Sequence, residues 1–271
     1  MTTFKFKGQY TVNVHTHTPA PADDQHTTLV FLTAIGVPLR KYSKLFTELV
    51  AKGYTVIAAD YPCCGENTPQ VDRSVDYNYQ DIIDDFIPQL LELSEHKDTY
   101  LFGHSLGGHM ATIYSALHDV PVIGVATGNL HYKNWQGAAG KLNILRAVAL
   151  FKPMLAIYGY FPGYKISFGD REPKGVMNDW CHTALTGRYD FIQADLQARK
   201  NAGSGRGIYF YIEGDDYAPY KSTQNLAKLC ADSTLISVKL PEHIKGNPHG
   251  AWIKDPDIIV QHLDEQLRKR D

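Results

Sequence analysis

Residues 98–118 read DTYLFGHSLGGHMATIYSALH, with a Gly-x-Ser-x-Gly pentapeptide between a strand-like run and a helix-like run. The run from Tyr100 to Phe102 suits a buried strand, and the apolar residues after the pentapeptide recur at helical spacing. A strand, a sharp turn and a helix are the layout of a nucleophile elbow, which exposes the side chain at its apex, here Ser105, above a sheet. Gly103 and Gly107 flank Ser105 because side chains there would collide across so tight a turn.

The pentapeptide alone is a weak signal, since Gly and Ser are common enough for it to arise by chance in about one in ten chains of this length. The alternative interpretation is a glycine-rich turn that joins a strand to a helix in any doubly wound protein. The other strands, and the residues that follow them, must therefore decide whether Ser105 is a nucleophile.

Length and charge restrict the classes of protein to which the chain can belong. Its 271 residues suffice for one large domain, or for one domain that carries an insertion. A net charge of −2 with dispersed Lys and Arg gives no electrostatic reason to bind nucleic acid. No apolar run approaches the ~18 residues of a membrane span, and the N-terminus lacks the apolar segment of a signal peptide.

The four cysteines indicate neither a disulfide scaffold nor a metal site. Cys63 and Cys64 are adjacent and poorly placed to pair with each other, while Cys181 and Cys230 have no C-x-x-C partner. No Cys or His spacing is typical of a zinc site. We interpret the cysteines as reduced thiols of a cytoplasmic protein, and the sequence predicts neither a metal nor an organic cofactor.

Apolar runs with little alternation predict strands that are covered on both faces, which is typical of a parallel sheet. Residues 4–18 alternate instead and predict two antiparallel edge strands. The helical pattern over 76–95 contains Pro88, which should kink that helix. The predicted fold class is therefore α/β, a mostly parallel central sheet with helices on both faces and Ser105 at the carboxyl end of a central strand. The predicted buried strands are 28–33, 54–59, 100–102, 120–126, 207–212 and 235–240, and the predicted helices include 39–52 and 220–230.

The alternation of strands and helices breaks between residues 129 and 206. Such a segment is too long for a plain crossover between two strands, and it contains a predicted helix over 138–151 and an aromatic loop over 158–165. We interpret 129–206 as a helical cap insertion over the carboxyl edge of the sheet, and 1–128 with 207–271 as the α/β core. The alternative is that its aromatic side chains merely build a small core of the insertion itself.

A serine hydroxyl is a poor nucleophile unless a base takes its proton and an acid orients that base. In chain order the acid follows the nucleophile and the base comes last, each on a loop after a strand. The acid should follow the strand that ends at Ile212, where Asp215 and Asp216 both qualify. Glu213 is a weaker third choice because it is too close to the end of the strand.

The base should lie in the loop after the last predicted strand, which holds His243 and His249. His249 is preferred because it stands late in that loop, ahead of the last helix, from where it can reach back over the sheet to Ser105. His243 is the alternative. His104 and His109 lie beside the elbow, where a structural or pocket-lining role is expected of them.

Acyl transfer also needs hydrogen-bond donors for the negative charge that develops on the former carbonyl oxygen. One donor should be the backbone N–H of Leu106, directly after Ser105. The second should come from the loop after the 28–33 strand, where we expect the N–H of Ile35. Position alone locates these two donors, because neither depends on the identity of a side chain.

Several stretches of the chain, the elbow included, are similar to stretches of one known superfamily. They are Thr33–Pro38, Gly103–Gly108, Tyr160–Gly163, Glu172–Pro173 with Val176–Met177 and Trp180, Thr186–Tyr189, and Asp215–Pro219. On these residues the chain resembles the α/β-hydrolases, and more narrowly a group of little-characterised bacterial predicted hydrolases. The resemblance spans residues 28 to about 255 and includes the insertion.

The resemblance implies the hydrolase fold and a Ser-Asp-His triad, but it supplies no substrate. It favours Asp215 over Asp216, because the spacing from Asp215 to Pro219 is similar to that of acid loops in the superfamily. Two departures affect the neighbouring pocket and its entrance. Residues 248–252 stand where a Gly-His followed by aromatics is typical, and Cys63-Cys64 stands where an Arg-Gly type of loop is usual.

We therefore expect a serine hydrolase that cleaves a carboxylic ester or related acyl compound, with a small-molecule acyl substrate. A thioesterase, peptidase or acyltransferase with the same triad is the alternative, and a non-catalytic small-molecule-binding protein on the same fold is a further one. The aromatic insertion favours an apolar acyl or alcohol group. The side chains expected to contact the substrate are His104, Tyr160, Trp180 and Trp252. The oligomeric state stays open.

Overall fold

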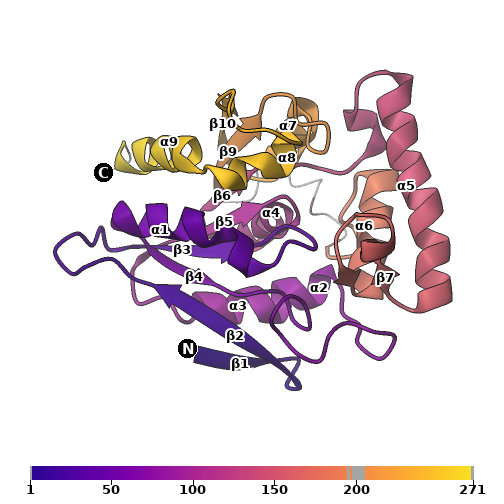
Figure 1. Cartoon of the computed structure of the whole chain (residues 1–271), viewed down its shortest axis with the longest axis horizontal. Coiled ribbons are helices and arrows are strands. Elements are labelled where there is room, and N and C mark those ends of the chain that lie inside the picture. Colours follow the sequence, from indigo (N-terminus) through magenta and orange to yellow (C-terminus); the bar gives the residue numbers. More distant parts are fainter. Residues whose placement is uncertain (1, 194–195, 197–204, 270–271) are drawn as a thin grey trace.

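The structure is a computed structural model that describes residues 2–193, 196 and 205–269. Within these residues lies an eight-stranded sheet, shown in Figure 1. Its strands, in their order across the sheet, are β1 (Thr2–Phe6), β2 (Tyr10–His17), β4 (Thr55–Ala58), β3 (Thr27–Leu32), β5 (Asp98–His104), β6 (Val122–Val125), β9 (Arg206–Ile212) and β10 (Asp232–Val238). The strands from β4 to β10 pair in parallel, whereas β1 and β2 pair antiparallel and β2 runs antiparallel to β4. The predicted parallel sheet with an antiparallel edge is confirmed.

The sheet separates two hydrophobic cores, because alternate side chains of each strand point to opposite faces. On β3, Leu29 and Phe31 enter the core that is covered by α1 (Ser43–Ala51) and α9 (Asp257–Arg268). Val30 and Leu32 enter the opposite core, covered by α2 (Tyr79–Asp81), α3 (Ile87–Leu91) and α4 (Leu106–His118) (Figure 1). Helices therefore cover both faces of the sheet, as the apolar runs predict.

The helix predicted over residues 76–95 departs from a single kinked α-helix. A π-helical turn over Ile82–Phe86 separates α2 from α3, and in it the N–H of Ile87 bonds to the carbonyl oxygen of Ile82. Pro88 is the second residue of α3, directly after this turn and Ile87. Because proline has no N–H and its ring crowds the carbonyl group four residues earlier, a locally wider turn accommodates it.

The described residues between β6 and β9 form two α-helices, a short strand pair and two short 3-10 turns. The α-helices and strands are α5 (Gly137–Tyr158), β7 (Phe161–Pro162), β8 (Arg171–Glu172) and α6 (Lys174–Thr186), and α5 packs along α6 beside the sheet (Figure 1). Helix α5 runs past the predicted 138–151 and ends at Gly159, whose φ of 77° is left-handed. Four aromatic rings pack together here at centroid distances of 4.6 to 6.1 Å, and so build a core within the segment: Phe151, Phe161, Phe168 and Trp180.

The remaining α-helices of the described residues are α7 (Tyr220–Ala227) and α8 (Pro248–Ala251), which follow β9 and β10 respectively. All four cysteines are free thiols, as the sequence predicts. None of the helices in residues 2–193, 196 and 205–269 is both long enough and apolar enough to cross a membrane.

Candidate active site

Ser105 stands between the end of β5 and the first residue of α4, with backbone angles of φ 52° and ψ −114°. Such a positive φ is unfavourable for a residue with a side chain and is found where the surrounding structure enforces it. A Cβ on Gly103 would lie 2.2 Å from the carbonyl carbon of Gly107, and one on Gly107 would lie 2.1 Å from the carbonyl oxygen of Leu32. The predicted collision across the turn is found at Gly103, whereas a side chain on Gly107 would collide with Leu32 of the neighbouring strand β3.

His249 lies in the first turn of α8 and points at Ser105. Its amide N–H donates to the side chain of Asn247, the N-cap residue, at 3.0 Å. Its Nε2 lies 2.8 Å from Ser105 Oγ, and its Nδ1 lies 2.8 Å from Asp215 Oδ2. Because an ionised carboxylate only accepts, Nδ1 carries the ring proton and Nε2 accepts from the serine hydroxyl.

Asp215 is only 2% exposed and is held by the turn after β9. Its Oδ1 accepts the backbone N–H groups of Tyr217 and Ala218 at 2.8 and 3.0 Å, which leaves Oδ2 for His249. These bonds fix the plane of the carboxylate and hence the orientation of the imidazole. The sequence left Asp216 open as the acid, but its side chain is exposed and its carbonyl oxygen accepts from Trp135.

The alternative base, His243, lies elsewhere. Its side chain is 68% exposed and its Nε2 lies 2.8 Å from Asp255 Oδ2. The loop that carries both histidines therefore brings only His249 to Ser105.

The first turn of α4 lies against the loop that follows β3. Gly107 makes this contact, since a Cβ there would meet the carbonyl oxygens of both Leu32 and Thr33. Within the residues that the structure describes, the N–H groups of Ile35 and Leu106 have no hydrogen-bond partner. Two unpaired donors thus lie in the two segments from which the sequence predicts an oxyanion hole.

His104 uses both of its ring nitrogens within the protein. Its Nε2 lies 2.8 Å from the carbonyl oxygen of His249, and its Nδ1 lies 2.8 Å from the hydroxyl of Tyr42. Tyr42 in turn accepts the N–H of Ala34 at 3.1 Å. Burial lowers the pKa of His104 well below its usual range, so the ring is neutral. Tyr42 was not predicted as a site residue, because its apolar spacing before α1 signals only a core position.

Residues 29–262 match the model of the Alpha/beta hydrolase family, which is most of the chain. The chain belongs to the α/β-hydrolase family. The family resemblance seen in the sequence is therefore confirmed, and this α/β-hydrolase is an enzyme of the hydrolase class. A comparison with curated proteins finds none that matches the chain.

Solved structures with the same fold include enzymes of several kinds. A thermophilic esterase from Thermogutta terrifontis has a TM-score of 0.64 at 14% identity, covering 98% of this α/β-hydrolase and 96% of the esterase. A monoacylglycerol lipase from Paleococcus ferrophilus has a TM-score of 0.62 at 17% identity, covering 94% and 98% of the two chains. A haloalkane dehalogenase variant from Bradyrhizobium elkanii has a TM-score of 0.65 at 13% identity, covering 95% and 97%. Identities this low show a shared fold and leave the substrate open.

The residues expected to contact substrate in this α/β-hydrolase occupy different environments. His104 is 1% exposed, and Trp252 is fully buried with its ring edge-on to that of His104 at 5.1 Å. Trp180 is 7% exposed and packs on Phe151. These three side chains are therefore buried in the interior, His104 at the end of β5 and the two tryptophans in helical segments, and their contact with substrate stays a prediction. Tyr160 is half-buried, its hydroxyl 3.4 Å from that of Tyr164, and its contact with substrate stays a prediction.

His109 also has a place in the interior. Its Nε2 lies 2.7 Å from the hydroxyl of Tyr189, and burial lowers the pKa of His109 to about 3. This neutral imidazole joins α4 to the segment between β6 and β9, which agrees with the structural role expected for it.

A cavity of about 190 Å³ opens beside the loop after β3. Glu172 lines it and is 4% exposed, and its Oε1 accepts the N–H of Asp170 at 3.1 Å. Burial raises the pKa of Glu172 to about 7, so this acid is partly neutral near neutral pH. The polar and charged residues among the rest of its lining are Thr33, Arg40, Asp60, Gln70, Asp170 and Arg171.

Proposed function

We propose that this α/β-hydrolase is a serine hydrolase that cleaves a carboxylic ester or related acyl compound. One observation supports this above all others: the unbroken hydrogen-bond sequence from Ser105 Oγ through the two ring nitrogens of His249 to Asp215 Oδ2, with both distances 2.8 Å. A serine hydroxyl hydrogen-bonded to an imidazole nitrogen, with the ring itself oriented by a buried carboxylate, is the arrangement that activates serine for acyl transfer.

In the proposed reaction Ser105 Oγ attacks the carbonyl carbon while His249 Nε2 takes the hydroxyl proton. The negative charge passes to the former carbonyl oxygen, where the N–H groups of Leu106 and Ile35 stabilise it. His249 then gives the proton to the leaving alcohol, and an acyl group remains on Ser105. Water then attacks the carbonyl carbon of the acyl group on Ser105 while His249 takes a proton from it. His249 returns this proton to Ser105 Oγ, which releases the carboxylic acid and restores the serine hydroxyl.

We also propose that residues 129–206 form a cap over the carboxyl edge of the sheet, with 1–128 and 207–271 as the core, although residues 1, 194–195, 197–204 and 270–271 of these ranges lie outside the described part of the chain. Contacts with the loops after β3 and β4 support it. A Cβ on Gly36 would lie 2.1 Å from the Cα of Gly169, and Cys64 Sγ lies 3.7 Å from the carbonyl oxygen of Arg171. Ligands of parallel α/β sheets bind at this edge, so a segment seated there faces the substrate.

Free thiols and the absence of a membrane-spanning helix among the described residues support a cytoplasmic location.

The cap carries tyrosines with exposed ring surface, Tyr158, Tyr160 and Tyr164, which favours an apolar acyl or alcohol group in the substrate. Hydrolysis rates for p-nitrophenyl esters of increasing acyl length test the substrate class. We expect rates to rise from acetyl to medium chains, and activity restricted to acetyl would contradict an apolar pocket.

Labelling with a fluorophosphonate probe tests the nucleophile directly. We expect the wild type to be labelled and Ser105→Ala to remain unlabelled. Ser115→Ala is the control, because Ser115 is a buried serine of α4, and this variant should be labelled like the wild type. A wild type that fails to react, when a known esterase reacts, would favour a non-catalytic binding protein on this fold. Labelling that survives Ser105→Ala would assign the nucleophile to another residue.

A further inference from the structure

Asp24, His26 and His96 converge at the end of the sheet opposite to Ser105. Asp24 and His26 lie in the turn before β3, and His96 lies just before β5. The register of the sheet brings these segments together, because Thr27 at the start of β3 pairs with Asp98 at the start of β5. Strand β5 then runs the depth of the sheet to the elbow, which places the cluster about 20 Å from Ser105.

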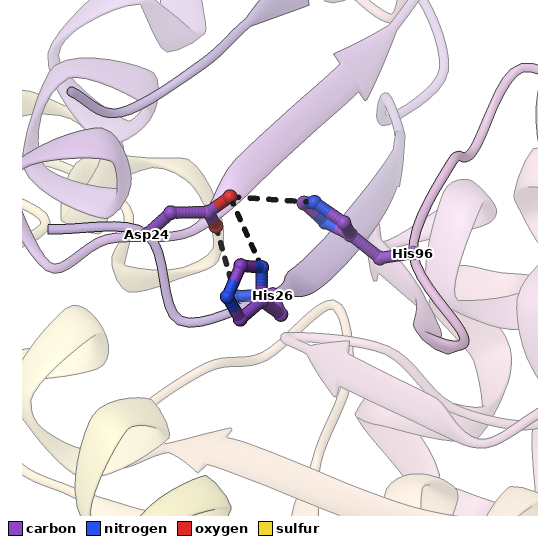
Figure 2. A group of neighbouring side chains, drawn as sticks. All are labelled: Asp24, His26 and His96. Atoms are coloured by element: carbon purple, nitrogen blue, oxygen red, sulfur yellow. Dashed lines mark hydrogen bonds and ion pairs between the residues drawn. The ribbon is translucent and has the colours of Figure 1, made fainter. Parts of the chain in front are cut away.

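The carboxylate of Asp24 faces both imidazole rings, as Figure 2 shows. Its Oδ2 lies 3.4 Å from His26 Nδ1 and 3.4 Å from His96 Nε2, and neither contact has the geometry of a hydrogen bond. Its Oδ1 accepts the backbone N–H of His26 at 2.8 Å. Asp24 Oδ2, which accepts no backbone hydrogen bond among the described residues, is therefore the oxygen that approaches the two ring nitrogens.

These separations match the spacing of ligands around a small divalent ion. Zn²⁺ binds imidazole nitrogen and carboxylate oxygen at about 2.0–2.2 Å in a tetrahedral arrangement, which separates neighbouring ligand atoms by about 3.4 Å. The three potential ligand atoms of Asp24, His26 and His96 all lie within 4.8 Å of one another. An ion placed between them could therefore contact all three with small side-chain movements.

The ring nitrogen of His96 that faces away from Asp24 has a hydrogen-bond partner of its own, as is usual for metal-bound histidines. Its Nδ1 lies 3.1 Å from the hydroxyl of Thr28, a fully buried residue of β3. If Nδ1 donates to Thr28, Nε2 is unprotonated and its lone pair points at Asp24. His26 instead is 82% exposed, which gives an ion a path from solvent and leaves room for water as a fourth ligand.

We propose that Asp24, His26 and His96 bind a divalent transition-metal ion, Zn²⁺ being the best fit. Two imidazole nitrogens with one carboxylate suit Zn²⁺, whereas Mg²⁺ and Ca²⁺ prefer sites made of oxygen. The ion ties the turn before β3 to the segment before β5, and its distance from Ser105 makes it a stabilising ion and not a catalytic one. Sequence spacing does not reveal this site, because His96 is far along the chain from the other two ligands.

Titration calorimetry with Zn²⁺ on chelator-treated full-length protein tests the proposal, with Mg²⁺ as the unsuitable cation. We expect His26→Ala and Asp24→Asn to weaken Zn²⁺ binding at least about 100-fold. His182→Ala is the matched control, since it removes an exposed imidazole that lies 2.8 Å from a single carboxylate, that of Asp190, and it should bind Zn²⁺ like the wild type. His26 is so exposed that its replacement should leave the fold intact, which circular dichroism checks.

Two further measurements separate this site from the free thiols. Co²⁺ bound at the site should give visible absorption typical of nitrogen and oxygen ligands, without thiolate charge transfer in the near ultraviolet. Saturation with Zn²⁺ at about 100 times the Kd should raise the Tm by about 5 °C in the wild type and not in His26→Ala. Equal Zn²⁺ affinity in the wild type and His26→Ala, or Co²⁺ spectra dominated by thiolate, would overturn the proposal.

Discussion

His104 donates a hydrogen bond from Nε2 to the carbonyl oxygen of His249, at 2.8 Å. Because the neutral ring then accepts at Nδ1, the bond from Tyr42 must run from its hydroxyl to His104, while the Tyr42 oxygen accepts from Ala34. This buried sequence of bonds joins the backbone beside Ile35 to the backbone of His249. The two segments that supply the proposed oxyanion donor and the proposed base are thus held by one set of hydrogen bonds.

Replacing Tyr42 by Phe should therefore affect stability and activity together. Loss of the hydroxyl leaves the Ala34 N–H and His104 Nδ1 unpaired in the interior, which should lower the free energy of unfolding by about 1–3 kcal/mol. Small displacements of Ile35 and His249 should lower kcat by about tenfold to a hundredfold. Urea unfolding and steady-state hydrolysis of a p-nitrophenyl ester measure the two effects.

Tyr61→Phe is the matched control for Tyr42→Phe. The Tyr61 hydroxyl is buried and has no hydrogen-bond partner among the described residues, so its removal should leave stability unchanged or raised. If both variants behave alike, the hydrogen bonds of Tyr42 do not position the site.

Asp215→Asn should nearly abolish turnover, because an amide in place of the carboxylate no longer fixes the tautomer of His249 that accepts the proton of Ser105. In serine enzymes with such a triad the equivalent change lowers kcat by about 10⁴-fold. Asp216→Asn changes an exposed neighbour whose side chain does not reach His249, and it should retain wild-type kcat. Steady-state kinetics of the two variants decide the matter, and comparable losses in both would exclude Asp215 as the sole acid.

The left-handed backbone at Ser105 predicts a stability difference between two inactive variants. Ser105→Ala keeps a Cβ at φ 52°, whereas Ser105→Gly removes it and with it most of the strain, which is about 1–3 kcal/mol. Glycine loses more chain entropy on folding, by about 0.5–1 kcal/mol. We expect the glycine variant to be the more stable by about 1 kcal/mol in urea unfolding, and an alanine variant of equal or greater stability would argue against strain at the elbow.

Buried Glu172 should make stability depend on pH. Burial raises the pKa of Glu172 to about 7, above its ordinary 4.5, so between these values the folded protein holds a proton that the unfolded chain has released. Stability therefore falls as pH rises through this interval, by up to about 3 kcal/mol from this one group. Glu172→Gln removes the ionisation and should flatten this fall.

Urea unfolding at about pH 5 and about pH 8 measures the change in both proteins. Other groups that titrate there, such as Asp179, whose pKa burial raises to about 6, contribute equally to the wild type and the variant. The difference between the two therefore isolates Glu172, and parallel pH profiles would contradict its burial as a neutral acid.

Local sequence patterns predicted most of the architecture. Uninterrupted apolar runs identified the parallel strands, because a strand covered on both faces needs apolar side chains on both. The glycines around Ser105 identified the elbow, because only a residue without a side chain fits where backbones nearly touch. Strand patterns and the collision at Gly103 act within a few residues along the chain, so the sequence carries them, whereas Gly107 is required by the distant Leu32.

The candidate site needed the tertiary structure wherever its members come from separate loops. Asp215 and Asp216 are adjacent, and His243 and His249 share a loop, so the sequence favours one member of each pair without excluding the other. The burial of His104 and Trp252 also depends on contacts between distant segments, since His104 bonds to the carbonyl oxygen of His249 and its ring meets that of Trp252.

The sequence by itself determined the sheet, the elbow and the order of the proposed triad along the chain. Only the tertiary structure decided which acid and which histidine meet Ser105, linked Tyr42 to His104, and brought Asp24 and His26 to His96. The physical reason is one of range. Secondary structure follows from contacts between neighbours in the chain, whereas a site depends on side-chain positions set by the packing of elements that are distant in sequence.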